Sequence, residues 1–347
     1  MSHLRLLHFL TKTLLCLPLA AQAFEWETRR FDGRDYVSTG SIATFYELPA
    51  PAPVVEPVPG QPPTVVALTS GKRQLSLTLG TRSSVINGVA HWLSFPVQYG
   101  DGRAWVSRMD VSRIVEPRFR PELIKGFEPV TTVVLDAGHG GHDKGARSSF
   151  GAEKDYSLDV VMRLRKRLEN AGYKVVLTRT TDRFIPLHER PAVANRISES
   201  IFVSVHFNGA GWNPAASGFE IFSITPRGAP STDQAQPATS DLREELGNSK
   251  ELPSAALAGS VFHAMLGRVP VSDRGIKHAR FAVLRVCERP GILVEGGFLT
   301  NSAEAAAIAK PEWRENLAEA IADGIDQYKL LAERGRAPKN VADYRKK

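Results

Sequence analysis

The sequence contains 347 residues with a formal net charge of +7, and this length accommodates two domains of about 100 to 200 residues each. A modest basic surplus suits polyanionic envelope polymers as well as nucleic acids, so charge alone does not identify the partner. Of the two cysteines, Cys16 lies in an N-terminal apolar run and Cys287 lies far downstream. Removal of that run would exclude a disulfide within the mature chain.

Residues 1–23 have the pattern of an export signal. Arg5 and Lys12 precede the apolar run Leu14 to Ala20, and Ala21-Gln22-Ala23 is the small-x-small pattern that a signal peptidase cleaves. We therefore expect a cleaved signal peptide and a protein that acts in the periplasm, outside the cell or in the cell wall, which argues against nucleic acid as a partner. The apolar run is shorter than the roughly 20 residues of a spanning helix. An uncleaved anchor is the less favoured alternative, and no later segment is predicted to cross a bilayer.

Residues 24–116 are predicted to form a small β-rich domain. Residues 49–63 contain seven prolines and should be an extended loop. After this loop, residues 73–80 alternate polar and apolar side chains, and Asn87-Gly88 and Asp101-Gly102 each separate two β-prone runs, as in tight hairpins. These hairpins resemble the copper amine oxidase N-terminal-like domain. No copper is implied, because the region offers His91 as its only histidine and no cysteine.

After a predicted linker at 117–130, strand patterns alternate with helix patterns, which predicts an α/β domain at 131–334 with a mostly parallel sheet covered by helices on both faces. A basic tail follows at 335–347. Residues 225–253 are polar and lack periodicity, so we expect either a mobile loop beside the substrate site or disorder. The expected strands are 132–136, 174–179, 201–207, 219–224, 281–286 and 291–295, and the expected helices are 153–171, 188–199, 254–267 and 312–333.

The loop after the first of these strands reads Gly138-His139-Gly140-Gly141-His142-Asp143. It lacks the last glycine of the dinucleotide fingerprint, and no Gly-Lys-Ser/Thr follows, so neither a dinucleotide loop nor a P-loop is predicted. His139 should emerge at the carboxyl end of a strand, where open α/β sheets carry their sites. A histidine in a glycine turn is by itself more often a surface residue than a ligand.

Two further residues favour a metal site. His206 closes the strand 201–207, and Glu153 begins the helix after the glycine loop. Two imidazoles and one carboxylate make a three-ligand set that leaves a tetrahedral zinc ion one open position, as in catalytic sites. Glu295 ends another strand and should face the same crevice; the alternative is a solvated surface glutamate.

The order and spacing of these motifs resemble the zinc-dependent N-acetylmuramoyl-L-alanine amidases of the Amidase_3 type over residues 131–330. The matching stretches are DAGHGG, a glutamate 14 residues after His139, SVHFN with His206 another 53 residues on, and VEGGFLTN with Glu295 89 residues further. The resemblance implies one zinc ion per chain, held by His139, Glu153 and His206, and Glu295 as the catalytic acid/base. It also implies peptidoglycan as the substrate, cleaved between N-acetylmuramic acid and L-alanine.

Secondary roles are predicted for three more residues. Asp136 could hydrogen-bond a ligand histidine, although a buried acid that caps the glycine turn is an equal alternative. Arg274 and Lys277 could bind carboxylates of the stem peptide, although basic loop residues are usually only solvated. The rival functions are a zinc peptidase that cuts within the stem peptide and a non-catalytic wall-binding protein. For the N-terminal domain we expect a wall polymer or a regulator as partner, or a role as a spacer.

Overall fold

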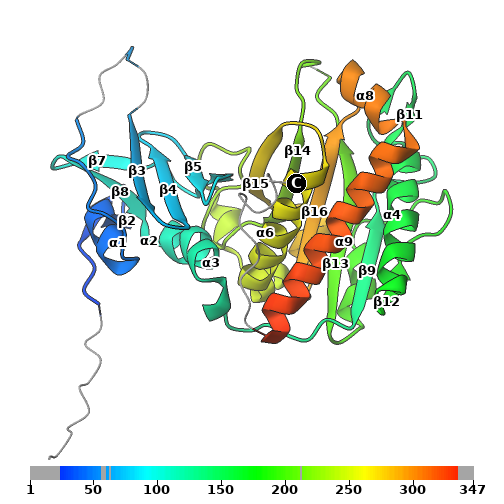
Figure 1. The fold of residues 1–347 in the computed structure, drawn as a ribbon, viewed down its shortest axis with the longest axis horizontal. Coiled ribbons are helices and arrows are strands. Elements are labelled where there is room, and N and C mark those ends of the chain that lie inside the picture. The colour runs from blue at the N-terminus through cyan, green and yellow to red at the C-terminus, as the bar shows by residue number, and fades with distance from the viewer. Residues whose placement is uncertain (1–23, 56–59, 62–63, 212, 335–347) are drawn as a thin grey trace, which may run out of the picture.

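The computed structural model describes residues 24–55, 60–61, 64–211 and 213–334. The predicted signal peptide at 1–23 and the basic tail at 335–347 lie outside these ranges, as does part of the proline-rich stretch. Figure 1 shows two lobes side by side, an N-terminal lobe of small strands and a larger lobe in which helices flank a sheet. No helix in the described ranges is both long and apolar enough to cross a bilayer.

The N-terminal lobe contains two runs of antiparallel strands around one apolar core. Both predicted hairpins are confirmed: Asn87 and Asp101 adopt φ angles of 52° and 52°, and the glycine after each also has positive φ. The elements are β1 Thr28–Phe31, β2 Arg34–Ser38, α1 Thr39–Phe45, β3 Val65–Ser70, β4 Arg73–Thr78, β5 Ser83–Ile86, β6 Val89–Trp92, β7 Gln98–Gly100 and β8 Arg103–Ser107.

A helical stretch rather than an open linker connects the lobes. It consists of α2 Arg108–Asp110, η1 Val111–Val115, α3 Glu116–Phe119 and η2 Pro121–Leu123. Val111, Ile114, Val115 and Phe119 from this stretch are buried in the core of the N-terminal lobe. The stretch therefore crosses the predicted boundary at 116, and the first residues of the predicted linker pack as part of the lobe.

The larger lobe has the expected α/β architecture. Its strands run in the order β12-β9-β13-β16-β14-β15, and all neighbouring pairs are parallel except β14 with β16. The strands are β9 Thr132–Ala137, β12 Lys174–Leu177, β13 Ser200–Asn208, β14 Phe219–Ile224, β15 Asp273–Ala279 and β16 Gly291–Phe298, and a two-stranded hairpin β10 Arg147–Ser148 and β11 Gly151–Ala152 precedes the first helix.

One sequence prediction in this lobe is wrong, and one strand was not predicted. Residues 281–286 were predicted as a strand but contain the helix α7, Ala282–Arg285. Val283 and Leu284 of this helix pack against the face of the sheet that α5, Glu189–Asn195, also covers. The missing sheet position is filled by β15, whose polar sequence gave no strand signal.

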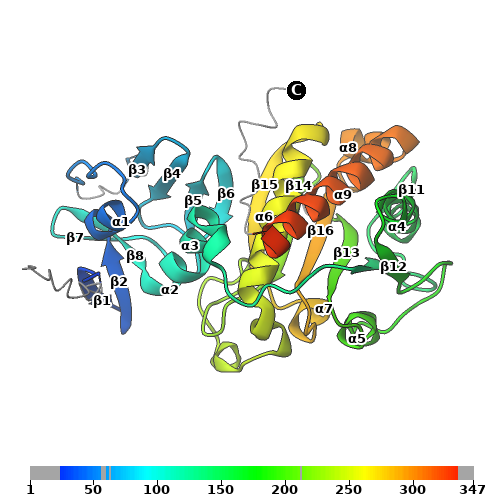
Figure 2. The same cartoon turned by 60° about the horizontal axis from the view of Figure 1, so that its bottom comes forward.

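Helices cover both faces of the sheet, as Figure 2 shows: α4, α6, α8 and α9 lie on one side, and α5 and α7 lie on the other. The helix α6 is buried around most of its circumference because α9 covers it on one side and β14 and β15 on the other. The bounds are α4 Glu153–Asn170, α5 Glu189–Asn195, α6 Glu251–Arg268, α8 Ser302–Ile308 and α9 Pro311–Arg334.

The sheet of the larger lobe continues into the N-terminal lobe. β15 pairs in parallel with β6, with Ile276 opposite His91, so that β6-β5-β4-β3 extend the sheet to ten strands among the described residues. Arg118 on α3 adds a second connection by donating to the carbonyl oxygen of Ala255 on α6 at 2.6 Å. The two lobes therefore share backbone hydrogen bonding.

Residues 225–253 are fixed by side chains of both lobes rather than by their own periodicity. They contain two short 3₁₀ helices, η3 Thr239–Leu242 and η4 Leu246–Lys250, and the first residues of α6. From the N-terminal lobe, Arg82 donates to the carbonyl oxygens of Pro230, Ser231 and Gln234. From the larger lobe, Arg280 binds the carboxylate of Asp241 at 3.0 Å. Side-chain donors to isolated carbonyls leave no pattern in the sequence, which explains why this order was not predicted.

The close packing of α9 on α6 generates a stability prediction. A Cβ added to Gly324 would lie 2.9 Å from the backbone nitrogen of Val261 and closer still to its Cα. Because backbone cannot yield as a flexible side chain can, Gly324→Val should destabilise the fold by about 1–3 kcal/mol, the usual cost of overpacking. Thermal unfolding followed by circular dichroism would measure the loss. Asn316→Val, at an exposed position of α9, is the control, and an equal effect of both variants would contradict the packing argument.

Candidate metal centre

The glycine-rich loop leaves the carboxyl end of β9 and turns sharply at His139, which has a φ of 59°. Two buried guanidinium groups hold this turn. Arg190 donates to the carbonyl oxygens of Ala137 and His139, and Arg179 donates to those of Ala137 and Gly138, all at 2.7–2.9 Å. The carbonyl groups that lose their strand partners where β9 ends are thereby satisfied.

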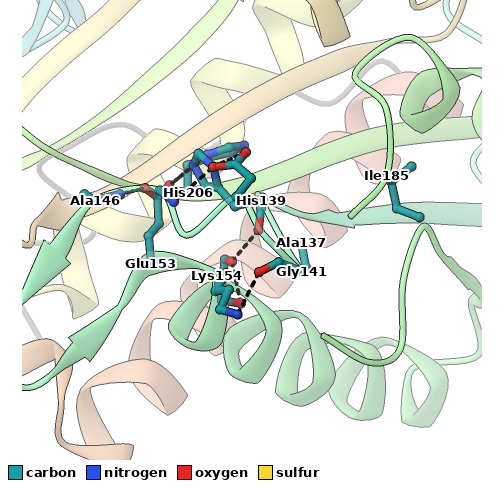
Figure 3. Close-up of polar contacts among 12 residues, drawn as sticks. Ala137, His139, Gly141, Ala146, Glu153, Lys154, Ile185 and His206 are labelled. Carbon is teal, nitrogen blue, oxygen red and sulfur yellow. Dashed lines mark hydrogen bonds and ion pairs between the residues drawn. The ribbon is translucent and has the colours of Figure 1, made fainter. Parts of the chain in front are cut away.

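His139, Glu153 and His206 come together from three separate elements. Glu153 is the first residue of α4, and its Oε1 lies 2.9 Å from His139 Nε2 and 2.9 Å from His206 Nδ1. The two imidazole ring centres are 4.9 Å apart. One donor atom from each residue lies within 4.8 Å of the others, which makes these three residues a group that could hold a metal ion (Figure 3). The convergence predicted from the sequence is thus present in the structure.

The carboxylate of Glu153 is buried, with 4% of the residue exposed. Burial by itself favours the neutral acid, but hydrogen bonds from both imidazoles outweigh it and lower the pKa of Glu153 to about 2. Two backbone groups also donate to this carboxylate, Phe207 N–H to Oε1 at 3.1 Å and Ala146 N–H to Oε2 at 2.7 Å. These donors favour the ionised form of Glu153 at neutral pH, which suits a ligand for a divalent cation.

The second nitrogen of His139 is oriented by Asp143, a residue that the sequence analysis missed. His139 Nδ1 lies 2.8 Å from Asp143 Oδ2, and the backbone N–H of Gly145 donates to the same carboxylate at 3.1 Å. Burial opposes protonation of His139, but the hydrogen bonds to Glu153 and Asp143 prevail and raise its pKa. A carboxylate on the non-ligating nitrogen is the usual way in which a ligand histidine is fixed. The spacing of four residues between His139 and Asp143 within one loop was the available sequence signal for this contact.

Asp136 was expected either in that role or, with equal weight, as a buried acid that caps the glycine turn. It is fully buried below the loop, where it accepts hydrogen bonds from Thr178 Oγ1 at 2.6 Å, Ser204 Oγ at 2.7 Å and Arg190 Nη1 at 3.0 Å. Its bonds tie β9 to Thr178 directly after β12, to β13 and to α5, and they reach the glycine loop only through Arg190. Asp143, in contrast, contacts the imidazole of His139.

Two glycines allow the imidazoles to pack directly against backbone. A Cβ on Gly138 would stand 2.6 Å from His206 Nδ1, and a Cβ on Gly145 would stand 2.6 Å from His139 Cδ2. Both distances are shorter than any ordinary carbon contact. The glycines of the loop are therefore needed for the space beside the ligands as well as for the turn.

Glu295 stands on β16 with its Cα opposite that of His206 on β13. Its Oε2 is buried without a hydrogen-bond partner among the described residues. Burial raises the pKa of Glu295 well above its ordinary value, the negative charges of Glu153 and Glu220 add to this effect, and Lys277 opposes it. A buried carboxyl oxygen without a partner beside three converging donors is expected of a group that exchanges protons with a bound molecule.

Arg274 and Lys277 on β15 both pair with Glu220, a second residue that the sequence analysis missed. Glu220 is buried on β14 with its Cα opposite that of Glu295, and its Oε2 binds Lys277 Nζ and Arg274 Nε, the latter at 2.9 Å. Asn208 Nδ2 donates to the other oxygen at 3.0 Å. The two cations are thus engaged by a protein carboxylate. The acidic residue within an otherwise apolar strand was the only sequence signal for Glu220.

A cavity of about 490 Å³ opens over the candidate ligands. His139, Glu153, His206 and Glu295 line one part of it, and Leu187, Phe281, Val283 and Leu293 line an apolar part. Leu187 and Phe281 are exposed at its rim. A molecule bound here would place a polar bond at the converging donors and apolar groups against α7 and the loop before α5.

Comparison with known proteins gives a family match over the larger lobe. Residues 133–327 match the Amidase_3 model, described as N-acetylmuramoyl-L-alanine amidase. Among curated proteins, the YqiI protein of Bacillus subtilis is 34% identical over 203 residues, covering 58% of this chain and 87% of that protein. The amidase AmiA of Escherichia coli is 32% identical over 218 residues, covering 56% of this chain and 75% of AmiA.

For another relative, the match covers a smaller share of the relative's own length. The amidase AmiC of Neisseria meningitidis is 34% identical over 224 residues, but the match spans 53% of that protein. Among solved structures, the N-acetylmuramoyl-L-alanine amidase of Clostridium difficile 630 is 33% identical with a TM-score of 0.49, covering 60% of this chain and all of that one.

The glycine packing predicts a loss of metal affinity without a change of ligand. In Gly138→Ala the added methyl group must displace the imidazole of His206, so the affinity for Zn²⁺ should fall by about 10- to 100-fold, the scale seen when support for a ligand is lost. Isothermal titration of the metal-free protein would measure it. Gly211→Ala is the matched control, because no atom of the residues that the structure describes lies within 4 Å of its Cβ position. Equal affinities of the two variants would contradict the prediction.

Proposed function

This chain belongs to the Amidase_3 family, a family of N-acetylmuramoyl-L-alanine amidases, and we propose that it cleaves the amide bond between N-acetylmuramic acid and L-alanine in peptidoglycan. The observation that carries the proposal is the meeting of His139, Glu153 and His206 beside Glu295 at one cavity. We further propose that these three residues hold one zinc ion and that Glu295 is the general acid/base.

The donor set fits zinc. Two imidazole nitrogens and one carboxylate oxygen are the ligands of many catalytic zinc sites, which keep a further position open. The ionised Glu153 would balance one of the two positive charges of the ion, and Asp143 orients His139 by its contact with Nδ1, which leaves Nε2 for the metal. A zinc ion bound there would polarise the amide carbonyl and acidify a water molecule.

In this proposal Glu295 takes part in two proton transfers. Its unpaired Oε2 accepts the proton of the attacking water and then delivers it to the nitrogen of the departing alanine. A raised pKa suits this exchange, because a carboxyl group must bind and release the proton near neutral pH. Glu220, which is paired with Arg274 and Lys277, lies on the neighbouring strand with its Cα opposite that of Glu295.

The remaining proposals concern location and substrate contacts. The signal-like residues 1–23 support export to the periplasm or the cell wall, where peptidoglycan lies. The apolar wall at Leu187 and Phe281 suits the methyl groups of the lactyl and alanyl moieties. The side chain of Arg274 is partly exposed, so it remains a candidate to bind carboxylates of the stem peptide. Such a carboxylate would compete with Glu220 for the guanidinium group.

Replacement of the proposed acid/base separates chemistry from metal binding. Glu295→Gln should retain one zinc ion per chain, because it removes no proposed ligand, while hydrolysis of sacculi falls by about 10²-fold or more, the usual contribution of general acid/base catalysis. Zinc content by atomic spectroscopy and release of soluble stem peptides would be measured on the same preparation. Turnover at the wild-type rate would remove Glu295 from the mechanism.

Metal removal and product analysis test the reaction itself. Chelation should abolish hydrolysis, and added Zn²⁺ should restore it, because the three ligands cannot polarise a carbonyl group themselves. Mass spectrometry of the digest should find intact stem peptides with a free N-terminal alanine. Shortened stems would identify a zinc peptidase instead, and a chain that binds sacculi but releases nothing would be a non-catalytic wall-binding protein.

A further inference from the structure

A groove of about 500 Å³ lies between the lobes and shares no residue with the cavity at the metal centre. The N-terminal lobe supplies most of its lining, including Arg34, Phe95, Arg108 and Met109. Residues 225–253 of the larger lobe supply the opposite rim through Gly228 and Leu242. A volume of this size is typical of sites for small ligands or short chains.

The groove exists because residues 225–253 are held against the N-terminal lobe. Arg82 from that lobe donates to three carbonyl oxygens in the segment 230–234. From the other side, Arg280 binds Asp241, the neighbour of Leu242. The rim is therefore fixed on both sides before any ligand binds, which lowers the entropy lost on binding.

The charges in the groove are unbalanced. Of the arginines that line it, Arg113 pairs with Glu251 at 3.6 Å, but Arg34 and Arg108 have no carboxylate partner in the part of the chain that the structure describes. Asp35, the acid in the lining, pairs with Arg30 on the same hairpin at 3.6 Å. Two guanidinium groups thus remain available for an anionic ligand.

The groove also offers apolar contacts, because Phe95, Met109 and Leu242 line it together with the two arginines. The guanidinium group of Arg34 lies 4.3 Å from the ring centre of Phe95, which fixes its plane against an aromatic floor. Met109 adds to the floor, and Leu242 is 61% exposed at the rim. An occupant that matches this surface carries both carboxylates and small apolar groups.

We propose that this groove binds the stem peptides of peptidoglycan, as a second wall-binding site apart from the metal centre. Stem peptides combine free carboxylates with alanine methyl groups, and a planar guanidinium group binds a carboxylate through two hydrogen bonds. The choice of this partner rests on the proposed function. An acidic protein segment is the competing occupant, but the ten residues that line the groove are fewer than the roughly 20–30 residues that each partner contributes to a stable protein interface.

The test is co-sedimentation with sacculi that have been stripped of attached anionic polymers, so that carboxylates are the only anions. The full chain would carry Glu295→Gln, which prevents digestion. Adding Arg34→Gln and Arg108→Gln should weaken binding by about 5- to 30-fold, the effect of two exposed charge pairs. The chain with Arg34 and Arg108 in place should bind amidated sacculi, which lack free carboxylates, more weakly by the same factor.

Lys125→Gln with Arg196→Gln is the matched control, because both side chains are exposed and neither has an ion pair within the described ranges. An equal loss in both pairs of variants, or no loss in the groove pair, would overturn the proposal. So would retained sacculus binding together with lost binding of a labelled polyglutamate peptide, which would identify an acidic protein segment as the occupant. Thermal unfolding would confirm that all variants are folded.

Hydrolysis is measured separately. In a chain that keeps Glu295, the groove pair should cleave a soluble muramoyl-peptide with unchanged kcat/KM, because no groove residue lines the catalytic cavity. Absent cleavage with intact sacculus binding would refute the proposed function and leave the groove proposal standing. Normal cleavage with unaltered sacculus binding by the groove pair would refute the groove alone.

Discussion

The site depends on one buried anion, the carboxylate of Glu153. Removing a carboxylate from water costs several kcal/mol unless donors replace the lost hydration. Here the donors come from the glycine loop, from the end of β13 and from the backbone before α4. Each donor must arrive at the correct position, so this single charge couples the start of α4 to the register of β13 and to the turn after β9.

The turn after β9 is held by the opposite arrangement, buried cations that bind carbonyl oxygens. Arg179 and Arg190 are almost completely buried, and between them they satisfy the carbonyl groups of Ala137, Gly138 and His139. Asp136 compensates the charge of Arg190 at 3.0 Å. Rigid, planar donors with several N–H groups suit this task better than a lysine would. The position of His139 is therefore set by long side chains from outside the loop.

The sequence predicts those parts of the structure that depend on local pattern. The hairpins at Asn87 and Asp101 follow from residues that tolerate positive φ, and the candidate ligands follow from histidines and glutamates placed where strands end and a helix begins. Parts that depend on distant partners were not predictable. β15 is polar because Arg274 and Lys277 neutralise Glu220, a contact across 54 to 57 residues. Residues 281–286 are apolar because α7 packs under the sheet, and a short apolar run does not distinguish that from a buried strand.

The junction between the lobes connects these features to the centre. An exposed edge strand would invite pairing with another chain, and β6 covers the edge of β15 through the pairing of His91 with Ile276. The next residue, Lys277, binds Glu220 on β14, and Glu220 faces Glu295 on β16. Four successive strands thus lead from the N-terminal lobe to the carboxyl group beside the candidate ligands. Because a one-residue slip of any of these strands would turn its side chains to the other face, docking of the N-terminal lobe helps to fix the charge environment of Glu295. The N-terminal lobe is in this sense part of the unit that carries the site.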